Sequence, residues 1–272
     1  MEQVCARPGP PTGDPMPVHL GSIDRGRART TFDQMAQSIA GYEASAEVTP
    51  FTSKFDAVLA GKAQFTTQEQ AGYDLFRGKA QCNACHRDGG PGEDPLFTDF
   101  TASNIGTPAN ARLPYYGEDR PDALGYVANP AGASFVDGGV GSFLANGHLL
   151  SRPSAVDGRW LKLAPGNQAR IQVPTLRNVD KRPYPDFVKA YMHNGYFTSL
   201  KAIVHYYNTR DVLPRCQPHD VGEGTTCWPA PESTDNMNTS RVGHLGLSDA
   251  EEDAIVSFMQ TLTDGFMPRD QR

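Results

Sequence analysis

The sequence has no long hydrophobic run and no basic cluster. No apolar stretch in its 272 residues approaches the roughly 18 residues needed to cross a bilayer, so no membrane span is expected. Lys and Arg number 25 against 31 Asp and Glu, which gives a net charge of −6 at pH 7. Nucleic acid and anionic membrane surfaces are therefore not expected partners.

The chain also lacks internal repeats and alternating β patterns. Apolar residues recur at helical spacing in residues 30–48, 198–209 and 245–265. Shorter helices are expected within 50–61 and 65–78, and Ser/Thr–Glu capping boxes mark two helix starts, at Thr66 and Ser248.

The remaining sequence is rich in turn-forming residues. With 27 glycines and 22 prolines, residues 88–175 and 211–240 are expected to be mostly irregular. The expected fold class is mainly α, with long loops.

Residues 1–14 have neither the basic start nor the apolar stretch of a signal peptide. This conflicts with the chemistry of the one motif in the chain. Cys82-Asn-Ala-Cys85-His86 is typical of covalent c-type haem attachment, in which two thiols bond the haem vinyl groups and the adjacent imidazole binds iron. A zinc site would need a second ligand pair, and a thioredoxin-like motif would need a βαβ context. Neither is present in the sequence.

Haem c is attached outside the cytoplasm, so the motif predicts an exported protein. We therefore expect Met1 to be an introduced or misassigned start, with the leader missing. In an oxidising compartment Cys216 and Cys227 are expected to form a disulfide that closes a loop of about 12 residues, worth roughly 3 kcal/mol. Cys5 is then left without a partner.

The second axial ligand of the iron is not identified by the motif. Met192, Met237, Met259, the other histidines and an exposed tyrosine are all candidates. Met259 lies on the apolar stripe of the last expected helix, whereas Met237 lies in a loop about ten residues before that helix. His193 is a candidate pocket residue. The remaining histidines are expected to be structural: His19, His148, His205, His219 and His244.

Five segments in order resemble the C-terminal haem domain of the bacterial di-haem cytochrome c peroxidase/MauG family. They are YDLFRGKAQCNACH, PLFTDFTASNIGTP, QVPTLRNVD, KAYMHNGYFTSLKAIVHYYNTRD and LGLSDAEEDAIVSFMQTLTDG. The resemblance covers about residues 50–265 and implies a cytochrome c-type domain. In this family one haem reacts with peroxide and the C-terminal haem relays electrons.

The resemblance implies that Cys82, Cys85 and His86 hold the relay haem. Family members place the second ligand fourteen residues after the histidine that corresponds to His193, which is Tyr207 here. A tyrosine at that position is typical of MauG-type members, so Tyr207 is the preferred ligand, with Met237 or Met192 as alternatives. His193 would line the pocket as a candidate acid/base residue, and Arg177 is a candidate partner for a haem propionate.

One departure limits what the resemblance implies, because there is no second CxxCH. Residues 1–50 resemble the end of the family's first haem domain plus a linker, and residues 51–272 form the haem domain. The expected function is electron transfer by one covalent haem c within a peroxidase/MauG-like oxidoreductase. The alternative is a stand-alone mono-haem electron carrier without peroxidase activity.

The expected partners are small redox proteins, either a cytochrome c or a cupredoxin. Hydrogen peroxide is a candidate substrate, with His193 assisting O–O cleavage, and calcium is a candidate ligand because family members bind it between their domains. The expected location is the periplasm or another exported compartment.

Overall fold

The structure is a computed structural model that describes residues 22–90, 92–123, 125–145, 158–217 and 219–267. Cys5, His19 and His148 lie outside the described residues.

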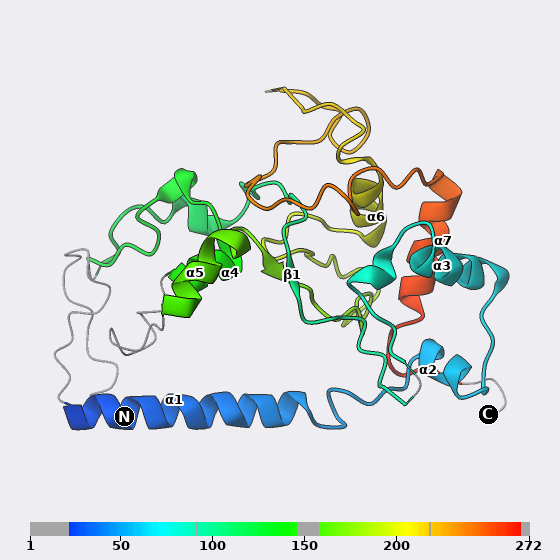
Figure 1. Cartoon of the computed structure of the whole chain (residues 1–272), viewed down its shortest axis with the longest axis horizontal. Helices are drawn as coiled ribbons and strands as arrows, with labels where there is room; N and C mark the ends of the chain where they lie inside the picture. The colour runs from blue at the N-terminus through cyan, green and yellow to red at the C-terminus, as the bar shows by residue number, and fades with distance from the viewer. Residues whose placement is uncertain (1–21, 91, 124, 146–157, 218, 268–272) are drawn as a thin grey trace. The chain divides into compact units, whose positions relative to one another are not determined.

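The chain divides into two compact units, one formed by residues 1–51 and 111–135 and the other by residues 52–110 and 136–272. Most regular structure in the described residues is helical (Figure 1), which confirms the mainly α class. None of the described helices has the length and apolar character needed to cross a membrane.

The described part of the first unit contains one long helix and two short 3₁₀ helices. Their bounds are α1 (Ser22–Glu43), η2 (Pro114–Gly117) and η3 (Gly132–Ser134). The apolar residues that predicted α1 are exposed, with Phe32 at 69% and Met35 at 59%. Helical spacing therefore predicted that a helix is present, but α1 begins eight residues before the predicted 30–48 segment, ends five residues before the end of that segment and does not bury this face.

The second unit contains the remaining elements. They are α2 (Lys54–Leu59), α3 (Thr67–Arg77), η1 (Cys82–Ala84), β1 (Ala102–Ser103), α4 (Gly139–Ala145), α5 (Gly158–Asn167), β2 (Ile171–Gln172), α6 (Leu200–Thr209) and α7 (Asp249–Gln260). β1 and β2 are antiparallel and pair Ala102 with Gln172. Because each strand has two residues, they join two loops and do not form a layer of the fold.

Capping boxes start α3 and α7, as predicted. In α3 the Thr66 hydroxyl accepts from the Glu69 amide, and the Glu69 carboxylate accepts from the Thr66 amide. Ser248 and Glu251 make the same reciprocal pair at α7. Each box satisfies donors that the first helical turn leaves unpaired, which fixes where these helices begin.

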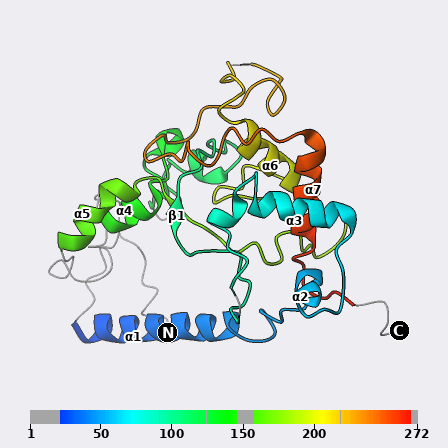
Figure 2. The same cartoon turned by 45° about the vertical axis from the view of Figure 1, so that its right-hand side comes forward.

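The core of the second unit is built where α3 crosses α7 (Figures 1 and 2). Gly72 allows the close approach, because a Cβ atom there would lie 1.9 Å from the Ala254 carbonyl oxygen and 2.9 Å from the Phe258 Cβ. Phe258 is fully buried and contacts the rings of Phe76 and Phe55 at centroid distances of 5.1 and 5.9 Å. The predicted buried stripe on the last helix is confirmed at Ile255, Phe258, Met259 and Leu262.

Two helices lie in the segment that was expected to be irregular. α4 begins at a glycine and α5 contains Pro165, so glycine and proline concealed both from sequence analysis. The two helices pack against each other (Figure 1), but Phe143, Trp160 and Leu163 are more than half exposed. Their apolar residues therefore do not all define a buried face.

α7 ends at Gln260, earlier than the predicted stop at Gly265. The turn that follows places the Asp264 carboxylate 2.9 Å from the Arg177 guanidinium, which also binds both Asp56 oxygens at 3.0 and 2.7 Å. The Arg177 and Asp264 side chains are only 6% and 2% exposed. This cluster ties α2 and the segment after α7 to the loop around residue 177.

The Asp56 carboxylate has a testable pH dependence. Burial raises its pKa, but hydrogen bonds from Arg177 and Ser53 outweigh burial and hold the pKa below its ordinary value of 3.8. A lowered folded-state pKa contributes stability above the unfolded-state pKa, and this contribution is lost as the pH falls through the folded-state value. Asp56→Asn should lower the free energy of unfolding by about 2 kcal/mol at pH 7, with a smaller difference at pH ~3.

Urea unfolding of both proteins at the two pH values measures this difference. Asp249→Asn is the control, because its ion pair with Lys201 lies at the surface and should contribute less. An Asp56→Asn difference that is unchanged in acid would contradict the pH dependence.

Candidate functional site

The haem-attachment motif lies just after the C-terminus of α3. α3 ends at Arg77 with Gly78 as its C-cap, and Gln81 adopts a left-handed conformation with φ 53°, which turns the chain into η1. The His86 amide donates to the Cys82 carbonyl at 2.9 Å, and the Cys85 amide donates to the same carbonyl at 3.2 Å. The turn therefore holds both thiols and the imidazole in one compact segment.

Cys82 and Cys85 are free and half-buried. Burial raises the pKa of Cys82 to about 12. Burial and the nearby Asp99 carboxylate also raise the pKa of Cys85, although the Arg241 guanidinium acts in the opposite direction. The raised pKa values favour the protonated thiols at neutral pH, and because the thiolate is the reactive form, both sulfurs should oxidise slowly in the folded chain.

The His86 ring is oriented by backbone carbonyls. Its Nδ1 atom lies 3.0 Å from the Phe97 carbonyl oxygen, and the Pro174 carbonyl also acts on the ring. A carbonyl can only accept, so Nδ1 must carry the proton, which leaves the lone pair on Nε2. Burial lowers the pKa of His86 against the opposing effect of these carbonyls, so the imidazole is kept neutral and able to bind a metal.

Tyr207 lies in the same buried region as the motif. Tyr207 and Cys82 both pack against one core cluster, and both motif cysteines lie near enough to influence the Tyr207 phenol. Burial, followed by these two thiols, raises the pKa of Tyr207. Within the described residues, none hydrogen-bonds to the Tyr207 hydroxyl, whereas the hydroxyl of the neighbouring Tyr206 donates to the Gly106 carbonyl.

The three methionine candidates lie in different surroundings. Met259 is 6% exposed within the core, as expected from its place on the α7 stripe. Met192 is partly buried against the same core, with φ 67°. The Met237 sulfur lies against Gly106, so closely that a Cβ on that glycine would be 2.7 Å away.

His193 pairs with a carboxylate that sequence analysis did not identify. Its Nε2 atom is 3.6 Å from Glu232 Oε2, and the two side chains are 19% and 6% exposed. The backbone next to His193 is tied to the loop at residues 108–110, since the Asn110 amide donates to the Asn194 carbonyl at 2.9 Å and the Asn194 amide side chain donates to the Pro108 carbonyl at 2.8 Å. A covered carboxylate at this distance can orient the imidazole ring of His193.

The other predicted site residues have protein partners. The Arg177 guanidinium binds Asp56 and Asp264, and its proposed contact with a haem propionate stays a prediction. His205 has a structural role of the expected kind, with Nδ1 2.9 Å from the buried Glu252 carboxylate. His219 and His244 are exposed.

The residues around the motif fit covalent haem and do not fit zinc. Two free thiols adjoin a neutral imidazole whose Nε2 is available, which is the donor set for thioether attachment and one axial bond to iron. Within the described residues, potential metal ligands gather closely at one place only, Cys216, Asp220 and Cys227. The motif cysteines therefore have no described third and fourth zinc ligands.

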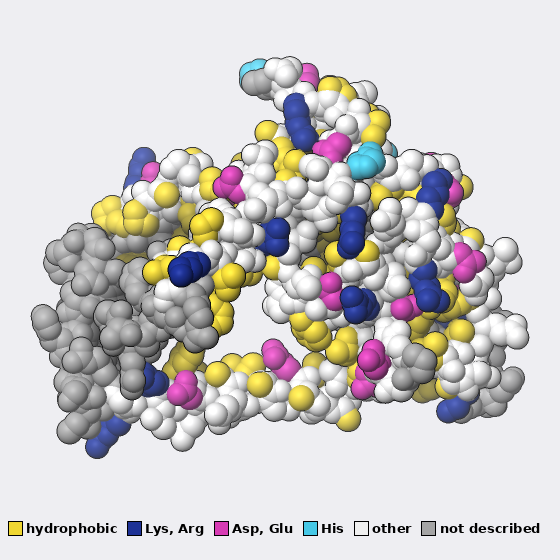
Figure 3. Space-filling model, viewed as in Figure 1, with side chains coloured by type: hydrophobic (Ala, Val, Ile, Leu, Met, Phe, Trp, Pro, Cys, Tyr) yellow, Lys and Arg dark blue, Asp and Glu magenta, His cyan; other side chains and the backbone are white. Residues whose placement is uncertain are grey.

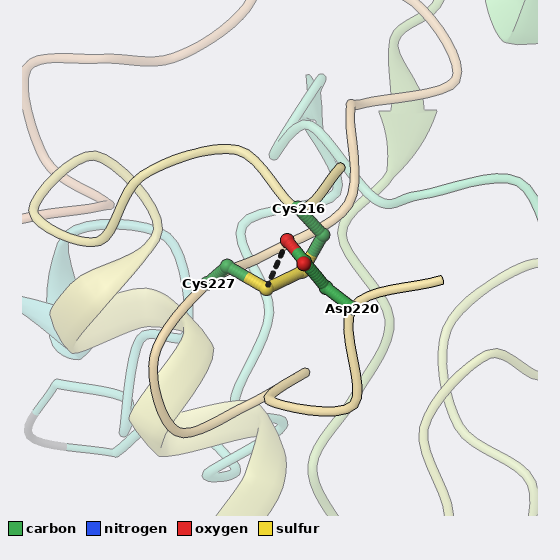
Figure 4. Close-up of side chains that lie close together, drawn as sticks. All are labelled: Cys216, Asp220 and Cys227. Atoms are coloured by element: carbon green, nitrogen blue, oxygen red, sulfur yellow. Dashed lines mark hydrogen bonds between the residues drawn. A yellow bond between two sulfur atoms is a disulfide. The ribbon is translucent and has the colours of Figure 1, made fainter. Parts of the chain in front are cut away.

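The Cys216–Asp220–Cys227 group is not a metal site, because its sulfurs are bonded to each other (Figure 4). Cys216 and Cys227, expected to form a disulfide, are joined by one in the structure. The Asp220 carboxylate lies 3.9 Å from the Cys227 sulfur. Metal binding would require thiolates, which a disulfide cannot supply.

On the face drawn in Figure 3, the described residues form no large patch of a single charge, because acidic and basic side chains are interspersed.

The site also depends on residues that gave no sequence signal. The Phe97 carbonyl orients His86, Glu232 pairs with His193, and Arg210 is fully buried near Tyr207. Backbone carbonyls and long-range pairs leave no motif in a single sequence.

No family model matches the chain, but individual proteins do. It is 35% identical over 236 residues to the methylamine utilization protein MauG of Paracoccus denitrificans, covering 86% of this chain and 52% of that protein. It is 24% identical over 198 residues to the cytochrome-c peroxidase IdrP2 of Denitromonas iodatirespirans, covering 73% of this chain and 40% of that protein.

The di-haem peroxidase BthA of Burkholderia thailandensis has a similar structure, with a TM-score of 0.54 and 27% identity over 81% of this chain and 48% of that one. The chain is a homologue of MauG and the di-haem cytochrome c peroxidases. It spans about half the length of these relatives. The family resemblance and the cytochrome c-type fold expected from sequence are both confirmed.

The disulfide should contribute measurably to stability. Replacing Cys216 and Cys227 with serine together should lower the free energy of unfolding by roughly 3 kcal/mol, since the unfolded chain gains the freedom of the opened loop. The loop base should remain, because the Cys216 amide donates to the Trp228 carbonyl and the Trp228 amide donates to the Pro214 carbonyl. Urea unfolding measures the loss, and a matching shift in the reduced unmutated chain is the control.

Proposed function

We propose that this chain is an exported c-type cytochrome unit that binds one covalent haem and transfers electrons within a MauG/cytochrome c peroxidase-type oxidoreductase. One observation carries the proposal. His86 is held by the Phe97 carbonyl with Nε2 available, directly beside the two free thiols of Cys82 and Cys85. The relatives support a c-type haem oxidoreductase in general.

Each residue of the proposed site has a separate role. Cys82 and Cys85 would form the thioether bonds, and His86 Nε2 would bind iron on one side. The bound haem would supply the capacity to accept and release single electrons. Buried rings such as Phe76, Phe97 and Tyr191 would exclude water from this region.

Tyr207 is the proposed ligand opposite His86. Its hydroxyl has no hydrogen-bond partner among the described residues, and both motif cysteines lie near enough to contribute to its raised pKa. Burial keeps the free phenol protonated, so binding as phenolate would require ferric iron to displace the proton. A hard anionic oxygen favours the ferric state and should lower the reduction potential relative to a methionine ligand.

Electrons would be exchanged with a small redox protein, such as a cytochrome c or a cupredoxin. Export follows from the requirement that haem c is attached outside the cytoplasm. His193 with Glu232 would provide a proton acceptor near the pocket if peroxide is cleaved.

Haem content tests the attachment. The chain produced with a c-type maturation system should carry one haem that acid–acetone does not extract, shown by the pyridine haemochrome and the intact mass. Replacing Cys82 and Cys85 together with alanine should abolish the covalent haem, while the exposed His219→Ala should retain it. If the unmutated chain carried no covalent haem, the proposal would be wrong. A separate assay of peroxide turnover distinguishes the two functions, because turnover by the mono-haem protein would favour a peroxidase over an electron carrier.

The ferric absorption and electron paramagnetic resonance spectra test Tyr207. Tyr207→Phe should convert most of the low-spin ferric signal to high spin, because phenylalanine has no ligand atom. Tyr206→Phe is the matched control on the same helix, and Met192→Leu and Met237→Leu test the alternative ligands. A spectrum unchanged in Tyr207→Phe and altered in Met192→Leu or Met237→Leu would assign the ligand to that methionine.

A further inference from the structure

Arg210 is a fully buried arginine at the C-terminus of α6. It lies three residues after Tyr207, and its exposed fraction is 0%. Burying a guanidinium is costly unless its donors are satisfied. The partners of Arg210 therefore show what the residue is positioned to hold.

The guanidinium joins α6 to two distant loops. Nη1 donates to the Ile105 carbonyl at 2.7 Å, and Nη2 donates to the Asn238 and Val242 carbonyls at 2.8 and 2.9 Å. Nε and Nη2 also donate to Asp211 at 2.9 and 2.5 Å. One side chain thus connects segments separated by more than 100 residues in sequence.

One of these loops returns a contact to Tyr207 itself. The Gly243 amide donates to the Tyr207 carbonyl at 2.6 Å, and the Gly243 carbonyl accepts from the Asp211 amide at 2.9 Å. Gly243 has φ 112°, and a Cβ atom there would lie 2.1 Å from Asp211 Oδ2. The chain therefore approaches the Arg210–Asp211 pair at a position that accommodates only glycine.

We propose that Arg210 is a positioning residue for Tyr207. It fixes the last turn of α6 against the loops at Ile105 and residues 238–243, and so sets the direction of the phenol toward the iron side of the site. This inference rests on the proposed role of Tyr207 as a ligand. Arg210 itself need not touch the haem.

The fork geometry of arginine is essential to this role. Arg210 uses three separate nitrogens to bind the Asp211 carboxylate and three backbone carbonyls. Lysine carries the same charge, but its single ammonium nitrogen cannot reach all four of these groups at once. Arg210→Lys and Arg210→Met therefore separate geometry from charge. If geometry decides, lysine should behave like methionine. If charge alone decides, lysine should restore the unmutated behaviour.

The experiment measures the ferric spectra of the haem-loaded variants and the hydrogen exchange of the Gly243 amide in the haem-free chain. Both Arg210→Lys and Arg210→Met should shift ferric iron from low to high spin. Exchange of the Gly243 amide should be on the order of 100-fold faster, because its carbonyl partner on α6 is no longer held in place. Asp211→Asn is a milder variant that should change both readouts in the same direction if Arg210→Met does not fold.

Lys54→Met is the control, because it breaks the Lys54–Glu69 ion pair in the same unit without touching α6. It should lower the urea midpoint but leave the ferric spectrum unchanged. An unchanged spectrum in Arg210→Lys, or an unchanged spectrum and Gly243 exchange in Asp211→Asn, would overturn the positioning role. Tyr207→Phe is measured in parallel. If its spectrum changes but that of Arg210→Lys does not, Tyr207 is a ligand that Arg210 does not position. If the Tyr207→Phe spectrum is also unchanged, the ligand proposal itself is wrong.

Discussion

The close contact between α3 and α7 determines where the haem motif lies. At Gly72 the two helices approach so closely that no side chain fits between that residue and the Ala254 carbonyl. The motif begins only a few residues after α3 ends, so the helix crossing also sets the position of Cys82 against the core. A change that separates these helices would move the thiols as well as weaken the packing around Phe258.

The two sides of the proposed site, His86 and Tyr207, are built from different kinds of interaction. On the His86 side, a short turn and one backbone carbonyl arrange the thiols and the imidazole. On the Tyr207 side, contacts from distant loops converge on α6 through Arg210. The first arrangement is local in sequence, whereas the second depends on the whole unit being folded.

This difference explains how much could be predicted from the sequence. Periodicity and capping residues predicted α3, α6 and α7. The CNACH segment predicted a haem-attachment site, because the residues that such a site needs are adjacent in the sequence. α4 and α5 were not predicted, because Gly139 and Pro165 are residues that usually interrupt helices. Phe97 contributes a carbonyl, which any residue has, and the Glu232 and Arg210 contacts join segments that no spacing rule connects.

The raised pKa values of Cys82 and Cys85 have a consequence for the order of biogenesis. A protonated, half-buried sulfur is less reactive than an exposed thiolate, so the thiols of the folded chain are less accessible for the proposed attachment than those of the open chain. If haem binds as proposed, attachment should be favoured before the core around Cys82 closes.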